Sequence, residues 1–274
     1  FKCATGEKTK VRKVIKTGAK RNTGTIIRFW PNEKYFDSPN VSVPKLRHLL
    51  RAKAVLCPGL EVTLIDEKAG ETETWQYADG LTEYLLDATR GWDRVPTDPF
   101  VGAMSADTEA VDWAVLWLPD AGEMVTESYV NLIPTAQGGT HVNGLRNGLT
   151  EALREFCEFR KLLPRGVKIA PEDVWDRCCY ILSLKHHDPQ FSGQTKERLS
   201  SRESAAFVSG ISKDAFSMWL NQHPEAGERI AMLAVNNAQS RLAAGKKIAR
   251  KRVTTGPALP GKLAECSAQD VTRS

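Results

Sequence analysis

The residues best suited to chemistry lie in one polar loop, 192–196, which has the sequence Ser-Gly-Gln-Thr-Lys. A glycine inside the loop and Pro189 just before it are typical of a turn between regular elements. Lys196 supplies a positive point charge and Gln194 an amide donor, and both groups bind phosphate oxygens. The residues alone leave two interpretations open. The loop is either solvated, as short lysine-bearing loops commonly are, or it contacts a phosphate held by something else.

The segments around this loop are expected to position it. The apolar run 178–184 is typical of a buried strand that enters the loop. A helix is expected after the loop, with an apolar stripe formed by Phe207, Ile211, Ala215 and Trp219. A second loop, Ile133–His141, carries paired glycines before another helix, and Thr140 is placed to cap that helix.

The remaining hydrophobic patterns predict a mixed α+β chain. Further helices are expected over 44–54, 81–89, 171–176 and 224–252. Strands are expected over 26–30, 60–64, 72–77, 100–106, 111–118 and 124–132. The last helix would be roughly 40 Å long at 1.5 Å per residue.

Positive charge gathers in two stretches. Residues 8–21 contain no acid and are either a solvated hairpin or a nucleic-acid contact. The end of the long helix carries Arg241, Lys246, Lys247, Arg250, Lys251 and Arg252. Cations stabilise the negative end of a helix dipole, but six exceed what capping needs, so contact with a DNA backbone is an equal alternative.

The bulk composition is that of an ordinary globular chain. Its 274 residues are 41% hydrophobic and 26% charged, with a net charge of +5. This length allows one large or two modest domains, and no apolar run approaches the roughly 20 residues that span a bilayer. The chain starts without a signal peptide or a methionine, so we expect it to begin inside a longer reading frame.

Several other reactive residue types predict no site. The six cysteines lack metal or redox spacing, and reduced thiols in a cytoplasm are the simplest interpretation. Adjacent His186 and His187 diverge on an extended chain, so no metal site is expected. His141 is interpreted as a structural hydrogen-bonding residue. The scattered carboxylates are interpreted as turn residues: Asp107, Glu109 and Asp112.

Three long segments together resemble the B subunits of bacterial type IIA topoisomerases. They are residues 133–141, 188–199 and 256–264, in the order that the family has. The resemblance extends from Asn22 to Asp270 and is closer to the topoisomerase IV branch than to the gyrase branch.

This resemblance implies a fold. Residues 1–77 would form the end of a Bergerat-type (GHKL) ATPase domain. Residues 78–223 would form a transducer domain of ribosomal-protein-like β-α-β fold, with a left-handed crossover and with helices on one side of a mixed sheet. Residues 224–253 would be a connecting helix, and 254–274 a linker towards a missing TOPRIM domain.

The resemblance also implies a function, namely coupling of ATP binding and hydrolysis to DNA strand passage, with relaxation and decatenation of DNA. Gln194 and Lys196 would touch the terminal phosphate of ATP, with Lys196 catalytic, and Thr25 would lie beside the adenine. Arg146 would line a cavity through which DNA passes. Further DNA contacts would come from Lys246, Lys247, Arg250, Lys251 and Arg252.

The implied cofactors are ATP and Mg²⁺, with the Mg²⁺ ligands outside this chain. The implied partners are the A subunit of topoisomerase IV in a heterotetramer, a second copy of the full-length protein, and DNA, in the bacterial cytoplasm and without a membrane. The general base and the glycine-rich lid would precede Phe1, so we expect this chain alone not to hydrolyse ATP.

Three alternatives stay open at this point. The first is the B subunit of gyrase, which would differ by introducing negative supercoils. The second is a non-enzymatic basic module, which would bind DNA in a salt-sensitive manner that is indifferent to ATP. The third is a related Bergerat-type ATPase, such as a chaperone or a mismatch-repair protein.

Overall fold

The computed structural model describes residues 2–4, 7–10, 24–29, 33–35, 38, 40–120 and 122–253, and the side chains of the last helix only as far as 244. The chain separates into two units, Phe1–Arg47 and His48–Ser274, and each is described by itself. Among the helices of the described residues, none has the length and hydropathy to cross a membrane. The elements in chain order are β1 (Lys2–Ala4), β2 (Glu7–Lys10), a 3-10 helix (Glu33–Tyr35), α1 (Val43–Leu56), β3 (Val62–Asp66), β4 (Glu71–Trp75), α2 (Gly80–Ala88), β5 (Val95–Ser105), β6 (Glu109–Trp117), β7 (Thr126–Val130), β8 (Ile133–Pro134), α3 (Thr140–Phe159), α4 (Pro171–Trp175), β9 (Cys178–His186), α5 (Arg202–Gln222) and α6 (Pro224–Val253).

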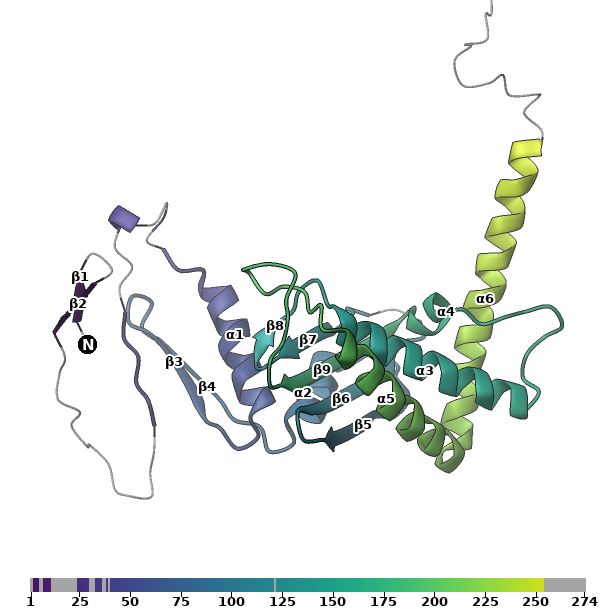
Figure 1. Cartoon of the computed structure of the whole chain (residues 1–274), viewed down its shortest axis with the longest axis horizontal. Helices are drawn as coiled ribbons and strands as arrows, with labels where there is room; N and C mark the ends of the chain where they lie inside the picture. The colour runs from purple at the N-terminus through teal and green to yellow at the C-terminus, as the bar shows by residue number, and fades with distance from the viewer. Residues whose placement is uncertain are drawn as a thin grey trace, which may run out of the picture. The chain divides into compact units, whose positions relative to one another are not determined.

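A five-stranded mixed sheet organises the second unit, in the order β5-β6-β9-β7-β8 (Figure 1). Strand β9 is antiparallel to β6 and parallel to β7. The chain reaches β9 from β7 through α3 and α4, which gives the expected crossover between parallel strands. The predicted mixed α+β class is therefore confirmed, while the hand of the crossover stays a prediction.

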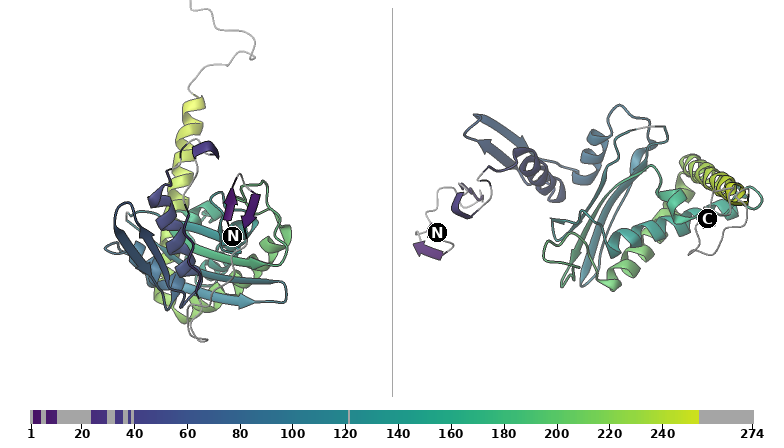
Figure 2. Two further views of the ribbon diagram at one scale, coloured as in Figure 1. Left: turned by 90° about the vertical axis from the view of Figure 1, so that its left-hand side faces the viewer. Right: turned by 90° about the horizontal axis from the view of Figure 1, so that it is seen from above.

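Helices cover both faces of this sheet, so the expectation of helices on one side is wrong (Figure 2). On one face, Trp113 and Leu182 pack in a core with residues of α3, α5 and α6. On the other face, Leu116 and Ile181 pack with residues of α1 and α2. The reason is that β6 and β9 carry apolar side chains on both faces, and an uncovered face would leave them in water.

Helices α3 and α5 lie side by side at very short range, and they run parallel (Figure 1). A Cβ on Gly144 would lie 2.6 Å from the carbonyl oxygen of Ala205. A Cβ on Gly148 would lie 2.1 Å from Ser212 Oγ. Only glycine allows this approach of two helix backbones.

The buried stripe of α5 is shifted by one residue from the predicted stripe. The predicted residues Phe207, Ile211, Ala215 and Trp219 are half-buried. The buried positions are Ser204, Val208, Ser212, Phe216 and Leu220. Hydrophobic periodicity missed this face because two of its members are serines, which fit the close contact with α3.

The junction between α5 and α6 is also tightly packed. A Cβ on Gly227, in the first turn of α6, would lie 2.9 Å from Phe156 of α3 and 3.0 Å from Leu220 of α5. The start of α6 is thereby held against the ends of both parallel helices.

The other helices and the β3–β4 hairpin lie within a few residues of their predicted ranges. The predicted strand 26–30 is an exception, because residues 24–29 form no regular structure and Ile26 is 98% exposed. A strand needs a neighbour to pair with, and none of the described strands pairs with these residues. Most of the cationic stretch 8–21 and the 254–274 linker lie outside the described residues. The domain boundary between 77 and 78 stays a prediction.

Candidate functional site

The loop that joins β9 to α5 holds the predicted phosphate contacts, and backbone hydrogen bonds fix its base. Leu199 pairs with Phe191 across the loop in an isolated antiparallel bridge. The Ser192 amide donates to the Arg198 carbonyl at 3.0 Å. The Leu199 amide donates to the Gly138 carbonyl, and the Thr140 amide donates to the Leu199 carbonyl, both at 3.1 Å. Two loops that are distant in sequence therefore form one unit.

The paired glycines are required by this approach. Gly139 has φ +141°, and a Cβ there would lie 2.4 Å from the carbonyl oxygen of Leu199. Gly138 is also in the left-handed region, with φ +62°. The double glycine that the sequence places before α3 therefore serves to dock the Lys196 loop.

Lys196 lies exposed in this loop with φ +57°, a left-handed conformation that is uncommon for a residue with a Cβ. Such a conformation costs about 1 kcal/mol. The Lys196 amide donates to the Gly193 carbonyl at 3.1 Å, which closes a tight turn over residues 193–196. The ammonium lies 5.8 Å from the ring centroid of Phe191, within the range of a cation–π contact. Backbone strain of this kind is typical of functional sites.

Gln194 is exposed in the same loop, two residues before Lys196. The loop is also tied by its side chains, since the Gln137 amide group donates to the Glu197 carboxylate at 2.8 Å. Parallel helices α3 and α5 both begin beside this loop, so their positive ends lie on the same side. An ammonium and an amide donor are groups that bind phosphate oxygens, and helix N-termini favour anions.

Of the predicted site residues, Gln194 and Lys196 are both exposed in the loop between β9 and α5. Thr25 is exposed and belongs to the unit Phe1–Arg47, which is described separately. The side chains of the cationic helix end lie outside the described residues, namely Lys246, Lys247, Arg250, Lys251 and Arg252. The roles of all these residues stay predictions.

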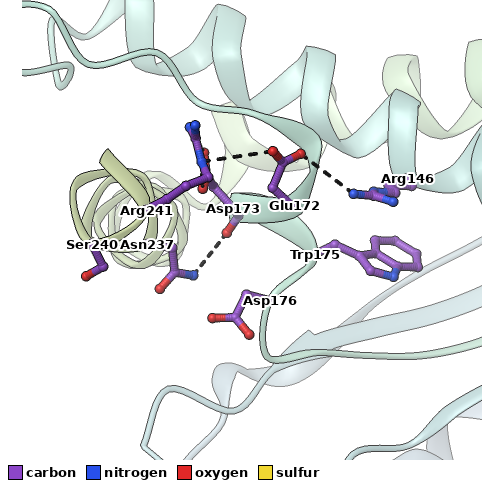
Figure 3. A pocket seen from close by; sticks show the side chains of 8 residues that line it. All are labelled: Arg146, Glu172, Asp173, Trp175, Asp176, Asn237, Ser240 and Arg241. Atoms are coloured by element: carbon purple, nitrogen blue, oxygen red, sulfur yellow. Dashed lines mark hydrogen bonds and ion pairs between the residues drawn. The ribbon is translucent and has the colours of Figure 1, made fainter. Parts of the chain in front are cut away.

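Arg146 lies at a groove between α3, α4 and α6 (Figure 3). Its guanidinium is 3.8 Å from the Glu172 carboxylate, and its Nε is buried without a hydrogen-bond partner among the described residues. Across the groove, Arg241 donates two hydrogen bonds of 2.8 Å to the Asp173 carboxylate. Asn237 donates to the Asp173 carbonyl at 3.0 Å. These hydrogen bonds and the Arg241–Asp173 ion pair hold α6 to α4.

His141 is the structural hydrogen-bonding residue that the sequence predicts. It is fully buried, and its Nε2 lies 3.2 Å from Thr135 Oγ1. Burial lowers the pKa of His141 to about 4, so the ring is neutral at neutral pH. The predicted cap at Thr140 is wrong. Gly139 is the N-cap residue, and the Thr140 hydroxyl is buried without a partner in the part of the chain that the structure describes.

Glu109 is the residue that the sequence reasoning misinterpreted. It is the first residue of β6 and is buried, whereas a turn residue was expected. Its carboxylate accepts a hydrogen bond from Ser204 Oγ at 2.7 Å and lies 3.4 Å from His186 Nε2. Asp112 also lies within β6, 3.6 Å from the Lys185 ammonium. The period-two spacing of Glu109 from the apolar residues Val111 and Trp113 could have indicated that Glu109 lies in the strand.

The family model described as DNA gyrase B matches residues 80–249. The chain belongs to the DNA gyrase B family. The match begins with α2, contains the whole five-stranded sheet, and ends within α6. It includes both loops of the candidate site. Membership in this family sets aside the related chaperone and mismatch-repair ATPases.

Two curated relatives from this family are similar to nearly the whole chain. The B subunit of DNA topoisomerase 4 from Salmonella typhimurium is 61% identical over 98% of this chain. The B subunit of DNA topoisomerase 4 from Pseudomonas aeruginosa is 62% identical over 99% of it. The chain spans 43% of the length of each of these relatives.

A solved structure extends the similarity to the fold. The topoisomerase IV ATP-binding domain of Francisella tularensis, in complex with a small-molecule inhibitor, matches with a TM-score of 0.68 and 38% identity. The match covers 78% of this chain and 58% of that one. The expected ATPase-and-transducer fold class is thereby confirmed.

Proposed function

We propose that this chain is the ATP-sensing transducer part of the B subunit of topoisomerase IV. The observation that carries the proposal is the geometry of the Lys196 loop. An exposed ammonium sits on a left-handed backbone position, in a loop whose base is docked on Gly138 and Gly139. The docked loop base fixes the backbone from which the ammonium extends, so less ordering remains when a phosphate binds.

In the proposed mechanism, Lys196 binds the terminal phosphate of ATP as a point charge, and Gln194 donates an amide hydrogen bond beside it. These contacts exist only while that phosphate is present, so its loss releases the loop. Thr25 would lie against the adenine. The binding and hydrolysis of ATP would supply the free energy for the movement of the loop. Mg²⁺ would bind with the ATP, through ligands from outside this chain.

For the whole protein, we propose relaxation and decatenation of DNA by passage of one duplex through another in the bacterial cytoplasm. The A subunit of topoisomerase IV would complete a heterotetramer, with two copies of the full-length protein. DNA contacts are proposed for Arg146 and the cations Lys246, Lys247, Arg250, Lys251 and Arg252. The high identity to proteins named as the B subunit of DNA topoisomerase 4 supports this assignment over its gyrase counterpart.

The test is DNA-dependent ATP hydrolysis by the full-length protein paired with its A subunit. We expect Lys196→Ala to lower turnover by about 100-fold, the typical effect of losing one charge-stabilising group, while DNA binding persists. Lys185→Ala is a matched control, because that lysine is also exposed and lies within β9, the strand that leads into the loop. Normal hydrolysis by Lys196→Ala would contradict the proposal.

Negative supercoiling by the wild-type complex would favour gyrase, and DNA binding indifferent to ATP in every variant would favour a basic module.

A further inference from the structure

A polar cluster, buried at Glu109 and His186 but 61% exposed at Glu203, joins the two stems of the Lys196 loop. His186 ends β9, on the entering side of the loop, and Glu203 and Ser204 lie in the first turn of α5, on the leaving side. Glu109, at the start of β6, lies between them. The His186 and Glu109 side chains are only 8% and 9% exposed. No step of the proposed mechanism uses this cluster directly.

The hydrogen bonds of His186 define the orientation of its ring. The Asp188 amide donates to His186 Nδ1 at 3.0 Å, so Nδ1 is an acceptor and the ring proton is on Nε2. That nitrogen lies 3.4 Å from a carboxylate oxygen of Glu109 and 3.4 Å from one of Glu203. Neither oxygen makes an aligned hydrogen bond with Nε2, so these are close polar contacts only. The Asn131 side chain completes the cluster by pairing with both backbone groups of His186.

The cluster adds side-chain contacts to the backbone pairing of β6 with β9, in which Glu109 lies opposite His186. The Ser204 hydroxyl donates to Glu109 at 2.7 Å and ties the start of α5 to β6. His186 reaches both carboxylates from β9. Nearer the tip, the Gln190 amide donates to Ser201 Oγ at 2.9 Å. The spacing between the loop stems is therefore set at two levels, by the Ser204–Glu109 and the Gln190–Ser201 hydrogen bonds, which limits the movement open to the tip.

We infer that His186 is a positioning residue for Lys196, acting with Glu109 and Ser204 to set the distance between the end of β9 and the start of α5. The inference rests on the proposed function, because it assigns to His186 a share in the phosphate contact of Lys196. It predicts that loss of the imidazole loosens the loop without unfolding the domain. Misplacement of a contact group by about 1 Å can cost up to about 100-fold in rate.

The first experiment measures the loop directly and requires no activity. Trypsin should cleave after Lys196 and Arg198 about tenfold faster in His186→Leu than in the wild-type full-length protein, since cleavage follows local opening. Cleavage after Lys161 and Arg165, in an exposed connection far from the cluster, is the internal reference and should be unchanged. His187→Leu is the matched control, because the neighbouring imidazole is exposed. Equal acceleration at all four sites would mean general destabilisation and would overturn the inference.

The second experiment is a double-mutant cycle on DNA-dependent ATP hydrolysis. His186→Leu should lower kcat by about tenfold in the wild-type background and have no further effect in the Lys196→Ala background. His186→Gln, which can still accept the Asp188 amide and donate to a carboxylate, should restore most of the rate. An equal loss in both backgrounds would show that His186 does not act through Lys196. Normal hydrolysis by Lys196→Ala alone would instead reject the proposed function. The trypsin experiment would then still decide whether His186 limits the opening of the loop.

Discussion

At the scale of single residues, His141 carries a pH dependence that the fold imposes on it. The ring is enclosed where β8, the double glycine and α3 meet, with Thr135 as its one hydrogen-bond partner and Nδ1 unpaired among the described residues. A charged imidazolium there would lose its hydration without gaining an anion. The neutral ring is therefore the form compatible with the folded state.

The pH prediction follows from the lowered pKa. Between pH 6.5 and about 4, the unfolded chain binds a proton at His141 that the folded chain does not bind. The free energy of unfolding should therefore fall as pH falls through this window, by up to about 1.4 kcal/mol per pH unit, with no contribution from His141 above it. Urea unfolding at several pH values measures this slope. The variant His141→Gln should have a shallower slope, and identical slopes would reject the assignment.

At the scale of elements, the contact of α3 with α5 depends on two glycines and the small residues that face them. At Gly148, a Cβ would meet Ser212 Oγ at 2.1 Å and the Ser209 carbonyl oxygen at 2.6 Å. The serine side chain can rotate away, but the backbone oxygen cannot. The two helices would have to separate, which disturbs the whole core face beneath them.

We expect Gly148→Ala to lower the free energy of unfolding by about 1–3 kcal/mol, the usual cost of overpacking. Its gain in helix propensity, about 1 kcal/mol, offsets only part of this cost. Gly210→Ala is the matched control on α5, because a Cβ there has nothing within 4 Å. That variant should be more stable than wild type by up to about 1 kcal/mol. Equal effects of the two substitutions in thermal or urea unfolding would show that the seam is not tightly packed.

The sequence predicted the helices and strands better than it predicted the details of the site. Helix α6 and the strands around Trp113 and Ile181 were predictable because their periodicity is strong. The buried face of α5 was not, since Ser204 and Ser212 carry no hydrophobic signal. The Lys196 loop could be located from its residue types and family resemblance. Its strained backbone, its dock on Gly139 and its cluster around Glu109 depend on tertiary contacts that no local pattern encodes.

At the scale of the whole molecule, an ion pair between Arg241 and Asp173 attaches α6 to α4. The Asp173 side chain is 2% exposed and is bonded to Arg241 of α6. Burial raises the pKa of Asp173, but the hydrogen bonds from Arg241 and from the Ala170 amide lower it more, so the pKa lies below its ordinary value. The stabilisation by this pair is therefore present above about pH 4 and is lost as pH falls below that value.

Removal of this attachment should loosen α6 selectively. In Arg241→Leu, the buried carboxylate loses its charged partner, and the backbone amides of α6 around residue 241 should exchange hydrogen about tenfold faster. Arg229→Leu is the matched control on the same helix, since its pair with Asp93 is more than half exposed on both sides. Hydrogen exchange followed by mass spectrometry measures this difference between the two variants. Unchanged exchange in Arg241→Leu would mean that apolar packing alone holds α6.

The close seam between α3 and α5 gives the domain the properties of a stiff mechanical beam. The two helix backbones approach closely at Gly144 and Gly148, and Lys213 of α5 adds ion pairs to Glu151 and Glu155 of α3, so the seam has little room to deform. One end of the beam lies at the Lys196 loop, and the other holds Gly227 in the first turn of α6. Under the proposed function, a displacement of the loop on phosphate binding would travel about 30 Å, the length of a 20-residue helix, without any element in between having to refold. The movement delivered to α6 would then be set by the size of the movement at the phosphate, and softening the seam would shorten it even if every contact at the loop were intact.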